Sequence, residues 1–180
     1  MSALVEVERP PAAAAGQPQQ YLTFVLAGEM LAMPIAPIKE IIEYGQVTRV
    51  PMMPEFIRGV INLRGAVVPV VDLASRFGGQ PGQVGRRTCI VIVELRVEGE
   101  PLVLGVVVDA VNAVLEIGPE SIEPPPAFGT RIRTDFIHGM GKVGGKFVVI
   151  LDVERVLSVE ELSVVGHAQA SAEGAGRAAA

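Results

Sequence analysis

The fold is decided by a stretch that occurs twice, first as Phe56-Ile-Arg-Gly-Val-Ile-Asn-Leu-Arg-Gly-Ala-Val-Val-Pro-Val-Val-Asp-Leu73. It aligns without gaps to Phe136-Ile-His-Gly-Met-Gly-Lys-Val-Gly-Gly-Lys-Phe-Val-Val-Ile-Leu-Asp-Val153, at an offset of 136 − 56 = 80 residues. Six of the 18 aligned positions are identical, including two glycines and an aspartate. Leu31–Glu43 also matches Leu104–Glu116, apolar for apolar, at an offset of 104 − 31 = 73. The chain therefore contains two structural units of the same kind.

Outward from the repeat, the pattern is one of short strands. Val- and Ile-rich runs alternate with Gly, Pro or polar turns, and this tight spacing is typical of small all-β barrels. We predict strands over Tyr21–Leu26, Met30–Ile35, Ile41–Tyr44, Val60–Leu63, Ala66–Val71, Thr88–Val97, Leu102–Val108, Ala113–Ile117 and Phe147–Leu151, and short helices at Asp72–Phe77, Asp152–Leu157 and Val159–Leu162.

Two repeated residue types have a clear local role. Gly65 and Gly145 lie between paired strands, where a turn with positive φ is expected. Asp72 and Asp152 follow buried runs, and we expect their carboxylates to cap the short helices.

Composition excludes several classes of protein. Hydrophobic residues make up 49% of the chain and mean hydropathy is +0.43, yet the longest apolar stretches fall far short of the roughly 18 residues of a spanning helix. Fifteen basic against twenty acidic residues give a net charge of −5, which opposes non-specific binding to nucleic acid. The N-terminus lacks the basic and apolar regions of a secretory signal, so we expect a cytoplasmic protein.

Catalytic and cofactor motifs are weak. Gly139–Gly144 matches the dinucleotide fingerprint as a string, but a strand follows it where the motif requires a helix. His138 and His167 have no second ligand at a fixed spacing, and His138 is expected in a turn, partly buried. Cys89 heads an apolar strand and is expected to be a small hydrophobe. We therefore predict no enzyme activity, no metal and no cofactor.

One charged pair is more informative. Glu40 is surrounded by apolar residues, and Arg64 ends an apolar strand beside a glycine turn. A carboxylate in such a place favours a bidentate arginine partner. Two interpretations stay open, a surface ion pair of little energetic consequence and a functional role at an interface.

The stretch Phe56–Leu73 strongly resembles the CheW family of chemotaxis coupling proteins, because it combines the turn glycines, the strand-end arginine and the helix cap of that family's signature. The resemblance extends over nearly the whole predicted ordered chain and includes Tyr21–Leu26, Ile38–Ile41, Gln46–Pro51, Leu104–Val111 and Phe136–Gly141.

The resemblance implies an all-β fold of two SH3-like five-stranded β-barrels packed side by side, with short helices. The expected boundaries are a disordered arm over residues 1–19, a CheW-like domain over 20–165 and a disordered tail over 166–180. Within the domain we expect a first barrel over about 20–77, a loop over 78–85, a second barrel over about 86–157 and a short helix over 158–165.

The resemblance also implies a non-enzymatic adaptor. It would couple the cytoplasmic tips of chemoreceptors to the regulatory domain of the histidine kinase CheA, without nucleic acid or membrane insertion, in arrays recruited to the membrane, and it could pair with other CheW copies in array rings. The alternative is an adaptor for a type IV pilus or another non-flagellar chemosensory pathway. Carried over by position, the receptor-binding groove comprises Ile38, Glu40, Gly59, Arg64, Cys89, Gly105 and Val111, and the kinase-binding residues are Ile42, Tyr44 and Val47.

Overall fold

The computed structural model of the chain describes residues 17–125 and 134–157. Its elements are β1 (Gln19–Leu26), β2 (Glu29–Pro34), β3 (Ile38–Glu43), β4 (Ile57–Leu63), β5 (Ala66–Asp72), α1 (Leu73–Arg76), β6 (Cys89–Val97), β7 (Glu100–Val108), β8 (Ala110–Ile117), η1 (Pro119–Ser121), β9 (Ile122–Glu123), η2 (Thr134–Phe136), β10 (Ile137–Val143), β11 (Lys146–Leu151) and α2 (Val153–Val156). The predicted helix at 158–165, the predicted tail and all but the last three residues of the predicted arm lie outside the described residues.

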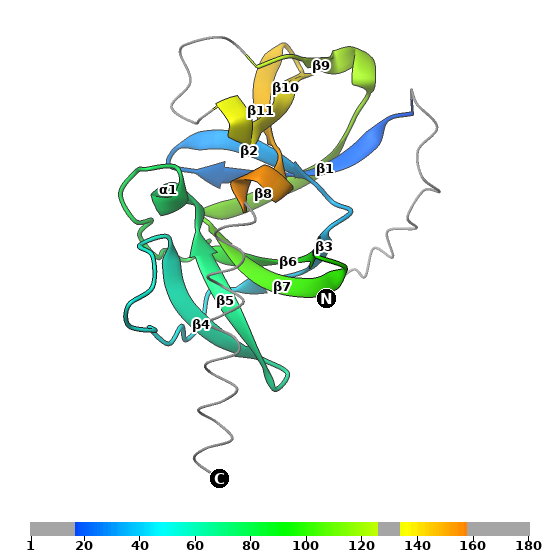
Figure 1. The fold of residues 1–180 in the computed structure, drawn as a ribbon. Coiled ribbons are helices and arrows are strands. Elements are labelled where there is room, and N and C mark those ends of the chain that lie inside the picture. Colours follow the sequence, from blue (N-terminus) through cyan, green and yellow to red (C-terminus); the bar gives the residue numbers. More distant parts are fainter. Residues whose placement is uncertain (1–16, 126–133, 158–180) are drawn as a thin grey trace.

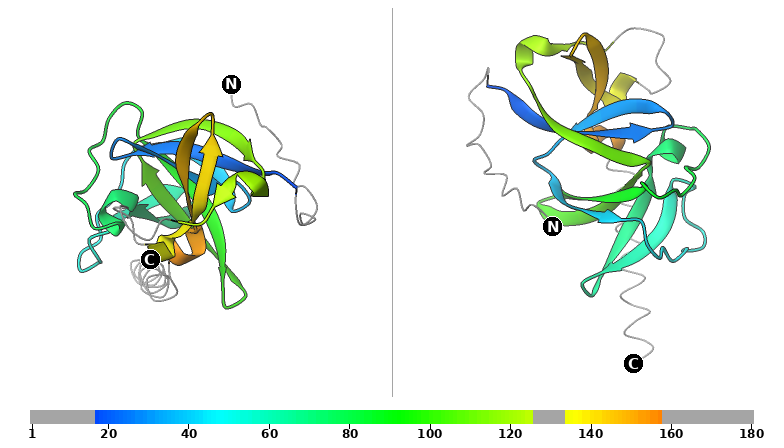
Figure 2. Two further views of the ribbon diagram at one scale, coloured as in Figure 1. Left: turned by 90° about the horizontal axis from the view of Figure 1, so that it is seen from above. Right: turned by 180° about the vertical axis from the view of Figure 1, so that it is seen from behind.

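The strands form two sheets, and the predicted all-β class with short helices is confirmed. One sheet has the order β8-β1-β2-β11-β10-β9 and the other the order β3-β6-β7-β5-β4. Figure 1 shows the first sheet in the upper half and the second in the lower half, and the rear view in Figure 2 shows the same two bodies. In the second sheet, a bridge between Thr48 and Val60 carries the chain after β3 across to the far edge strand β4. In the first, β9 reaches β10 in the same way.

The content of the two barrels differs from the predicted division at residues 78–85. The continuous barrel consists of β3 to β7, residues 38–108, whereas the discontinuous barrel combines β1 and β2 with β8 to β11. The reason is long-range parallel pairing, of β2 with β11 and of β5 with β7, which no local pattern encodes. Each repeat therefore gives its first hairpin to the barrel that the other repeat completes, and the 78–85 segment connects α1 and β6 on the side of the continuous barrel.

Local predictions at the turns and caps are confirmed. Gly65 and Gly145 have φ of 88° and 79°, in two-residue hairpin turns of the kind that match strand twist. Asp72 accepts a hydrogen bond from the amide of Ser75, and Asp152 accepts one from the amide of Arg155, both at 3.2 Å. The two short helices thus begin at repeat-related aspartates.

The largest hydrophobic core lies between the barrels. It joins 22 buried residues from both sheets, for example Phe24 and Val91, whereas the barrel interiors hold clusters of six and five buried residues. Side chains alternate along each strand, so Ile90 and Ile92 of β6 fill the continuous barrel while Val91 and Val93 face the shared core. The core between the two barrels therefore contains more buried residues than the interior of either barrel.

Candidate functional site

The predicted ion pair between Glu40 and Arg64 is present. Both guanidinium Nη atoms of Arg64 donate to the two carboxylate oxygens of Glu40, at 2.7 and 2.8 Å. The Glu40 hydrogen bond raises the pKa of Arg64 above its usual value. Arg64 occupies the first position of the β4–β5 turn with φ of 52°, and its side chain is 75% exposed. The pair therefore joins edge strand β3 to the hairpin at the opposite edge of its sheet.

This pair is specific to the first repeat. The equivalents of Glu40 and Arg64 in the second repeat are Ala113 and Gly144, which carry no charge. The ion pair therefore occurs in one of the two repeats only, as expected for a feature that the fold itself does not require.

Edge strands β3 and β8 carry a matched apolar set, Ile38, Ile41, Val111 and Val114. Ile38 and Val111 are half-buried against the shared core, while Ile41 and Val114 are 41% and 52% exposed. Ile41 pairs with Val91 and Val114 pairs with Leu22, and both partners are buried between the barrels. Directly paired residues share a face, so the set lines the border of the shared core.

Sequence reasoning found half of this apolar set. Ile38 and Val111 were predicted, but Ile41 and Val114 were not. The signal was available, because the offset of 73 residues relates Ile38 to Val111 and Ile41 to Val114.

Cys89, the first residue of β6, lies next to both edge strands that carry the apolar set, β3 and β8. It pairs with Glu43 at the end of β3, and its thiol donates to the carbonyl oxygen of Arg87 at 3.3 Å. Burial, and secondly the Glu43 carboxylate, raise the pKa of the thiol, against a smaller lowering by the Val111 backbone amide. Cys89 is therefore a protonated, half-buried apolar residue, as its position in the sequence indicated.

Gly59 and Gly105 are buried, unlike the other predicted groove residues. A Cβ on Gly59 would lie 2.1 Å from the carbonyl oxygen of Thr48, and one on Gly105 would lie 2.7 Å from Cγ2 of Ile90. Both glycines therefore allow close packing within the continuous barrel. Any effect of these positions on a partner would act through the shape of that barrel.

The three predicted kinase-binding residues are grouped on the continuous barrel. Ile42, Tyr44 and Val47 are half-buried and pack against its interior cluster. The segment that carries Tyr44 and Val47 runs from β3 to the Thr48 bridge, so these residues lie along the closure of the barrel.

A network around Asp72 was not predicted. The Asp72 side chain is 2% exposed and accepts hydrogen bonds from Arg58 Nε at 2.8 Å and from the amide of Gly82 at 3.2 Å. Arg58 also donates to the carbonyl oxygen of Gly82 and, at 3.1 Å, to the hydroxyl of Tyr44. Burial lowers the pKa of Arg58, but the bonds to Tyr44 and Asp72 outweigh it and raise the pKa above its usual value.

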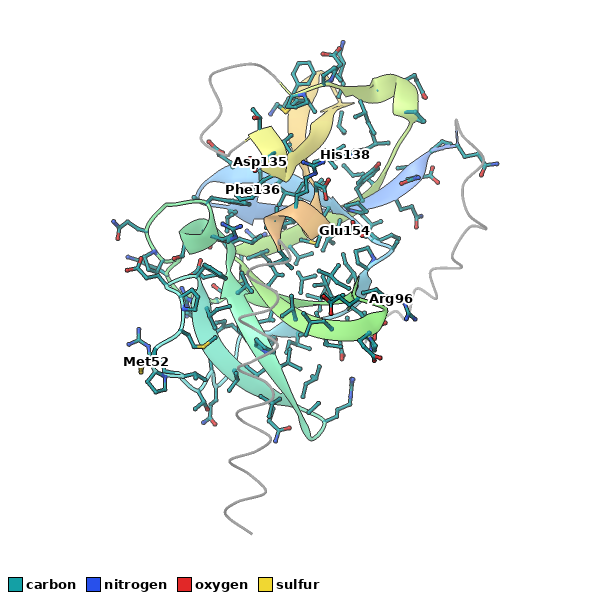
Figure 3. All side chains as sticks on the ribbon, in the orientation of Figure 1. Met52, Arg96, Asp135, Phe136, His138 and Glu154 are labelled. Carbon is teal, nitrogen blue, oxygen red and sulfur yellow. The ribbon has the colours of Figure 1, made fainter. Side chains whose placement is uncertain are left out.

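Sequence motifs that suggested chemistry have other places in the fold. Gly139–Gly144 runs along β10 into the β10–β11 turn, and no helix follows directly. His138 is exposed in strand β10, which corrects the prediction that it lies partly buried in a turn. Figure 3 labels it together with Asp135 and Phe136, which precede it in the chain. Among residues 17–125 and 134–157, no group of three or more His, Cys, Asp or Glu could hold a metal ion. In the same ranges, no helix has the length and apolar character needed to cross a membrane.

Comparison with known proteins agrees with the fold. The model of the CheW-like domain matches residues 20–161. The chain is 36% identical over 149 residues to the chemotaxis protein CheW of Klebsiella aerogenes, covering 83% of this chain and 87% of that protein. It is 30% identical over 161 residues to the CheW of Treponema pallidum, covering 88% and 94%. The crystal structure of the scaffolding protein TtCheW from Thermoanaerobacter tengcongensis is similar, with a TM-score of 0.70, 35% identity and coverage of 86% and 94%.

The fold defines the class first: this is a two-barrel β protein built from an internal repeat, and its fold is similar to that of a scaffolding protein of known structure. The match over residues 20–161 and the identity to full-length relatives then define the family. The chain belongs to the CheW family of chemotaxis adaptor proteins.

Proposed function

We propose that this protein couples the cytoplasmic tips of chemoreceptors to the regulatory domain of the histidine kinase CheA, and that it does so within arrays at the membrane. The observation that supports this most directly is the apolar set on β3 and β8. Two repeat-related pairs provide a half-buried base, Ile38 and Val111, and an exposed outer part, Ile41 and Val114. A helical receptor hairpin with an apolar stripe fits such a surface.

The ion pair supports the receptor surface indirectly. Successive residues of a strand face opposite sides, so Glu40 lies on the barrel side of β3 while Ile41 lies on the side of the shared core. By joining Glu40 to the β4–β5 turn, Arg64 holds the edge strand that presents Ile38 and Ile41. We infer that the pair sets the position of β3 for receptor binding.

Binding of a receptor cytoplasmic fragment to the full chain tests the apolar surface. Ile41→Asp and Val114→Asp should each weaken binding at least tenfold, the size of an interface hot spot. Both residues are exposed, so thermal unfolding should change little. Met52→Asp is a matched control, because Met52 is fully exposed elsewhere on the surface (Figure 3). Unchanged receptor binding in both strand variants would contradict the proposed surface.

Receptor-dependent activation of the kinase tests the ion pair. Glu40→Ala and Arg64→Ala should each reduce activation with the fold intact, and the exchange of charges in Glu40→Arg/Arg64→Glu should restore part of it. Lys39→Ala is the control, since Lys39 lies beside Glu40 on β3 and forms a 3.5 Å ion pair with Glu94 of the neighbouring strand β6. If Glu40→Ala and Arg64→Ala both activate the kinase fully, the ion pair has no role in receptor coupling.

A pull-down with the receptor fragment and the kinase regulatory domain tests the coupling itself. The expected result is a ternary complex that needs this protein. Without a ternary complex the coupling function is wrong. The interface would be modest and reversible for each copy, and arrays would supply avidity through many linked contacts.

A further inference from the structure

The 78–85 segment is fastened to the continuous barrel at a defined point. Gly82 offers both backbone groups to the barrel, its amide to the Asp72 carboxylate and its carbonyl to the Arg58 guanidinium. Asp72 is 2% exposed on its side chain and Arg58 is 16% exposed, so the anchor is shielded from water. Hydrogen bonds between charged groups and a shielded backbone are stronger than neutral ones.

The second repeat shows that this anchor is not needed to cap a helix. Asp152 caps α2 with the same 3.2 Å geometry while its side chain is 31% exposed. The residue equivalent to Arg58 is His138, which is exposed in β10. The additional contacts of Asp72 therefore serve the 78–85 segment.

The anchor also connects the segment to Tyr44. Arg58 donates to the Tyr44 hydroxyl and lies over its ring, 5.5 Å from the centroid. Beyond the segment, the amide of Tyr44 donates to the carbonyl oxygen of Thr88 at 3.2 Å, and the Thr88 hydroxyl accepts from the amide of Gly85 at 2.8 Å. Both ends of residues 82–88 are thus held against one tyrosine.

Val84 lies between these two anchoring points and is 53% exposed. Neither of its neighbours in the chain is apolar, since Gln83 precedes it and Gly85 follows. The exposed Val84 thus belongs to a stretch that is anchored on both sides at Tyr44, one of the predicted kinase-binding residues. Arg58 adds no net charge there because Asp72 neutralises it.

We propose that the anchored stretch of residues 82–88 is part of the kinase-binding surface, with Val84 contacting the kinase regulatory domain and Arg58 and Asp72 as positioning residues. This inference rests on the proposed function, in which that domain is the partner. The kinase regulatory domain would present a complementary apolar patch to Val84.

Affinities of the full chain for the kinase regulatory domain and for the receptor fragment test the proposal. Val84→Asp should weaken kinase binding at least tenfold and leave receptor binding within twofold. Gln80→Asp is the matched control, because it adds the same charge to the segment before the Gly82 anchor. Kinase binding by Val84→Asp within twofold of the unchanged chain would overturn the contact. Failure of the unchanged chain to bind the kinase would instead refute the proposed function.

The positioning role has a separate measurement. Arg58→Gln should speed amide hydrogen exchange over residues 79–85 and weaken kinase binding severalfold, with receptor binding unchanged. An equal loss for both partners would show a general structural role and overturn the positioning role. If Arg58→Gln fails to fold, a photo-reactive residue at Val84 in the full chain replaces it. Cross-linking to the kinase domain at Val84 and not at Gln80 is expected, and equal or absent cross-linking at Val84 would overturn the proposal.

Discussion

Arg76 donates a hydrogen bond from Nε to the carbonyl oxygen of Val156 at 2.9 Å, and Val156 is its own counterpart in the second repeat, 80 residues on. The Arg76 guanidinium also lies over two aromatic rings, 5.3 Å from the centroid of Phe56 and 4.6 Å from that of Phe136. These two phenylalanines are repeat counterparts as well. A single residue of α1 thus joins equivalent positions of both repeats.

Removing this side chain should destabilise the protein substantially. We expect Arg76→Ala to lower the free energy of unfolding by about 2–4 kcal/mol, from two cation–π contacts and a charge-assisted hydrogen bond. Arg155→Ala is the control, because Arg155 is 69% exposed and its ion pair with Asp152 spans 3.6 Å. Urea unfolding followed by circular dichroism measures both. Equal midpoints for the two variants would contradict the joining role of Arg76.

Gly59 should tolerate no side chain. Its φ is 151°, and a Cβ would meet the Thr48 carbonyl that takes part in the bridge to Val60. We expect Gly59→Ala to cost about 2–4 kcal/mol of stability, because both backbone strain and a clash with the main chain are involved. Gly45→Ala is the matched control, since an added Cβ there has nothing within 4 Å. Thermal unfolding within a degree of the control would contradict this prediction.

Sequence patterns predicted the local features of this fold well and its long-range pairing poorly. The capping by Asp72 and the turn at Gly65 depend on a few neighbouring residues, so a single sequence encodes them. Strand β10 was missed as a strand on composition, because glycine lowers β propensity, although the repeat aligned it with β4. The exchange of hairpins between barrels depends on parallel partners far along the chain, such as β2 and β11.

The site shows the same division. Glu40 and Arg64 could be paired from sequence, because each is a charge in an apolar context that a partner of opposite sign satisfies. In the sequence, Arg58 precedes the predicted strand Val60–Leu63, and capping of the following helix is a sufficient local role for its partner Asp72. Only the folded chain brings Gly82 and Tyr44 to Arg58, so nothing in the local pattern indicated the network.

Cys89 should react with alkylating reagents at a higher pH than an unfolded cysteine. Because its pKa is raised in the folded state, the folded protein holds the thiol proton more tightly. The free energy of unfolding therefore falls as pH rises from below the unfolded thiol pKa to above the folded one. Mass spectrometry of iodoacetamide labelling against pH, in buffer and in urea, measures the difference directly, since Cys89 is the sole cysteine.

Two carboxylate variants test the cause of the raised Cys89 pKa, one at Glu43 and a control at Glu94. Its carboxylate is the second cause of the raised pKa, so Glu43→Gln should move the labelling midpoint of Cys89 to lower pH. Glu94→Gln should leave the midpoint unchanged, because Glu94 pairs with Lys39 elsewhere on the sheet. A midpoint for the folded protein equal to that in urea would refute the assigned shift.

The two barrels should unfold in one transition, because the core that they share is larger than the core of either. Each barrel contains one tyrosine, Tyr21 in the discontinuous barrel and Tyr44 against the interior of the continuous one, and the chain has no tryptophan. Tyr21→Phe and Tyr44→Phe therefore leave a single fluorescent reporter in one barrel or the other. We expect the reporter of each variant to give the same urea midpoint as circular dichroism of that variant, the standard test of two-state behaviour. A fluorescence midpoint that precedes the circular dichroism midpoint in either variant would show that one barrel unfolds alone, and would contradict stabilisation through the shared core.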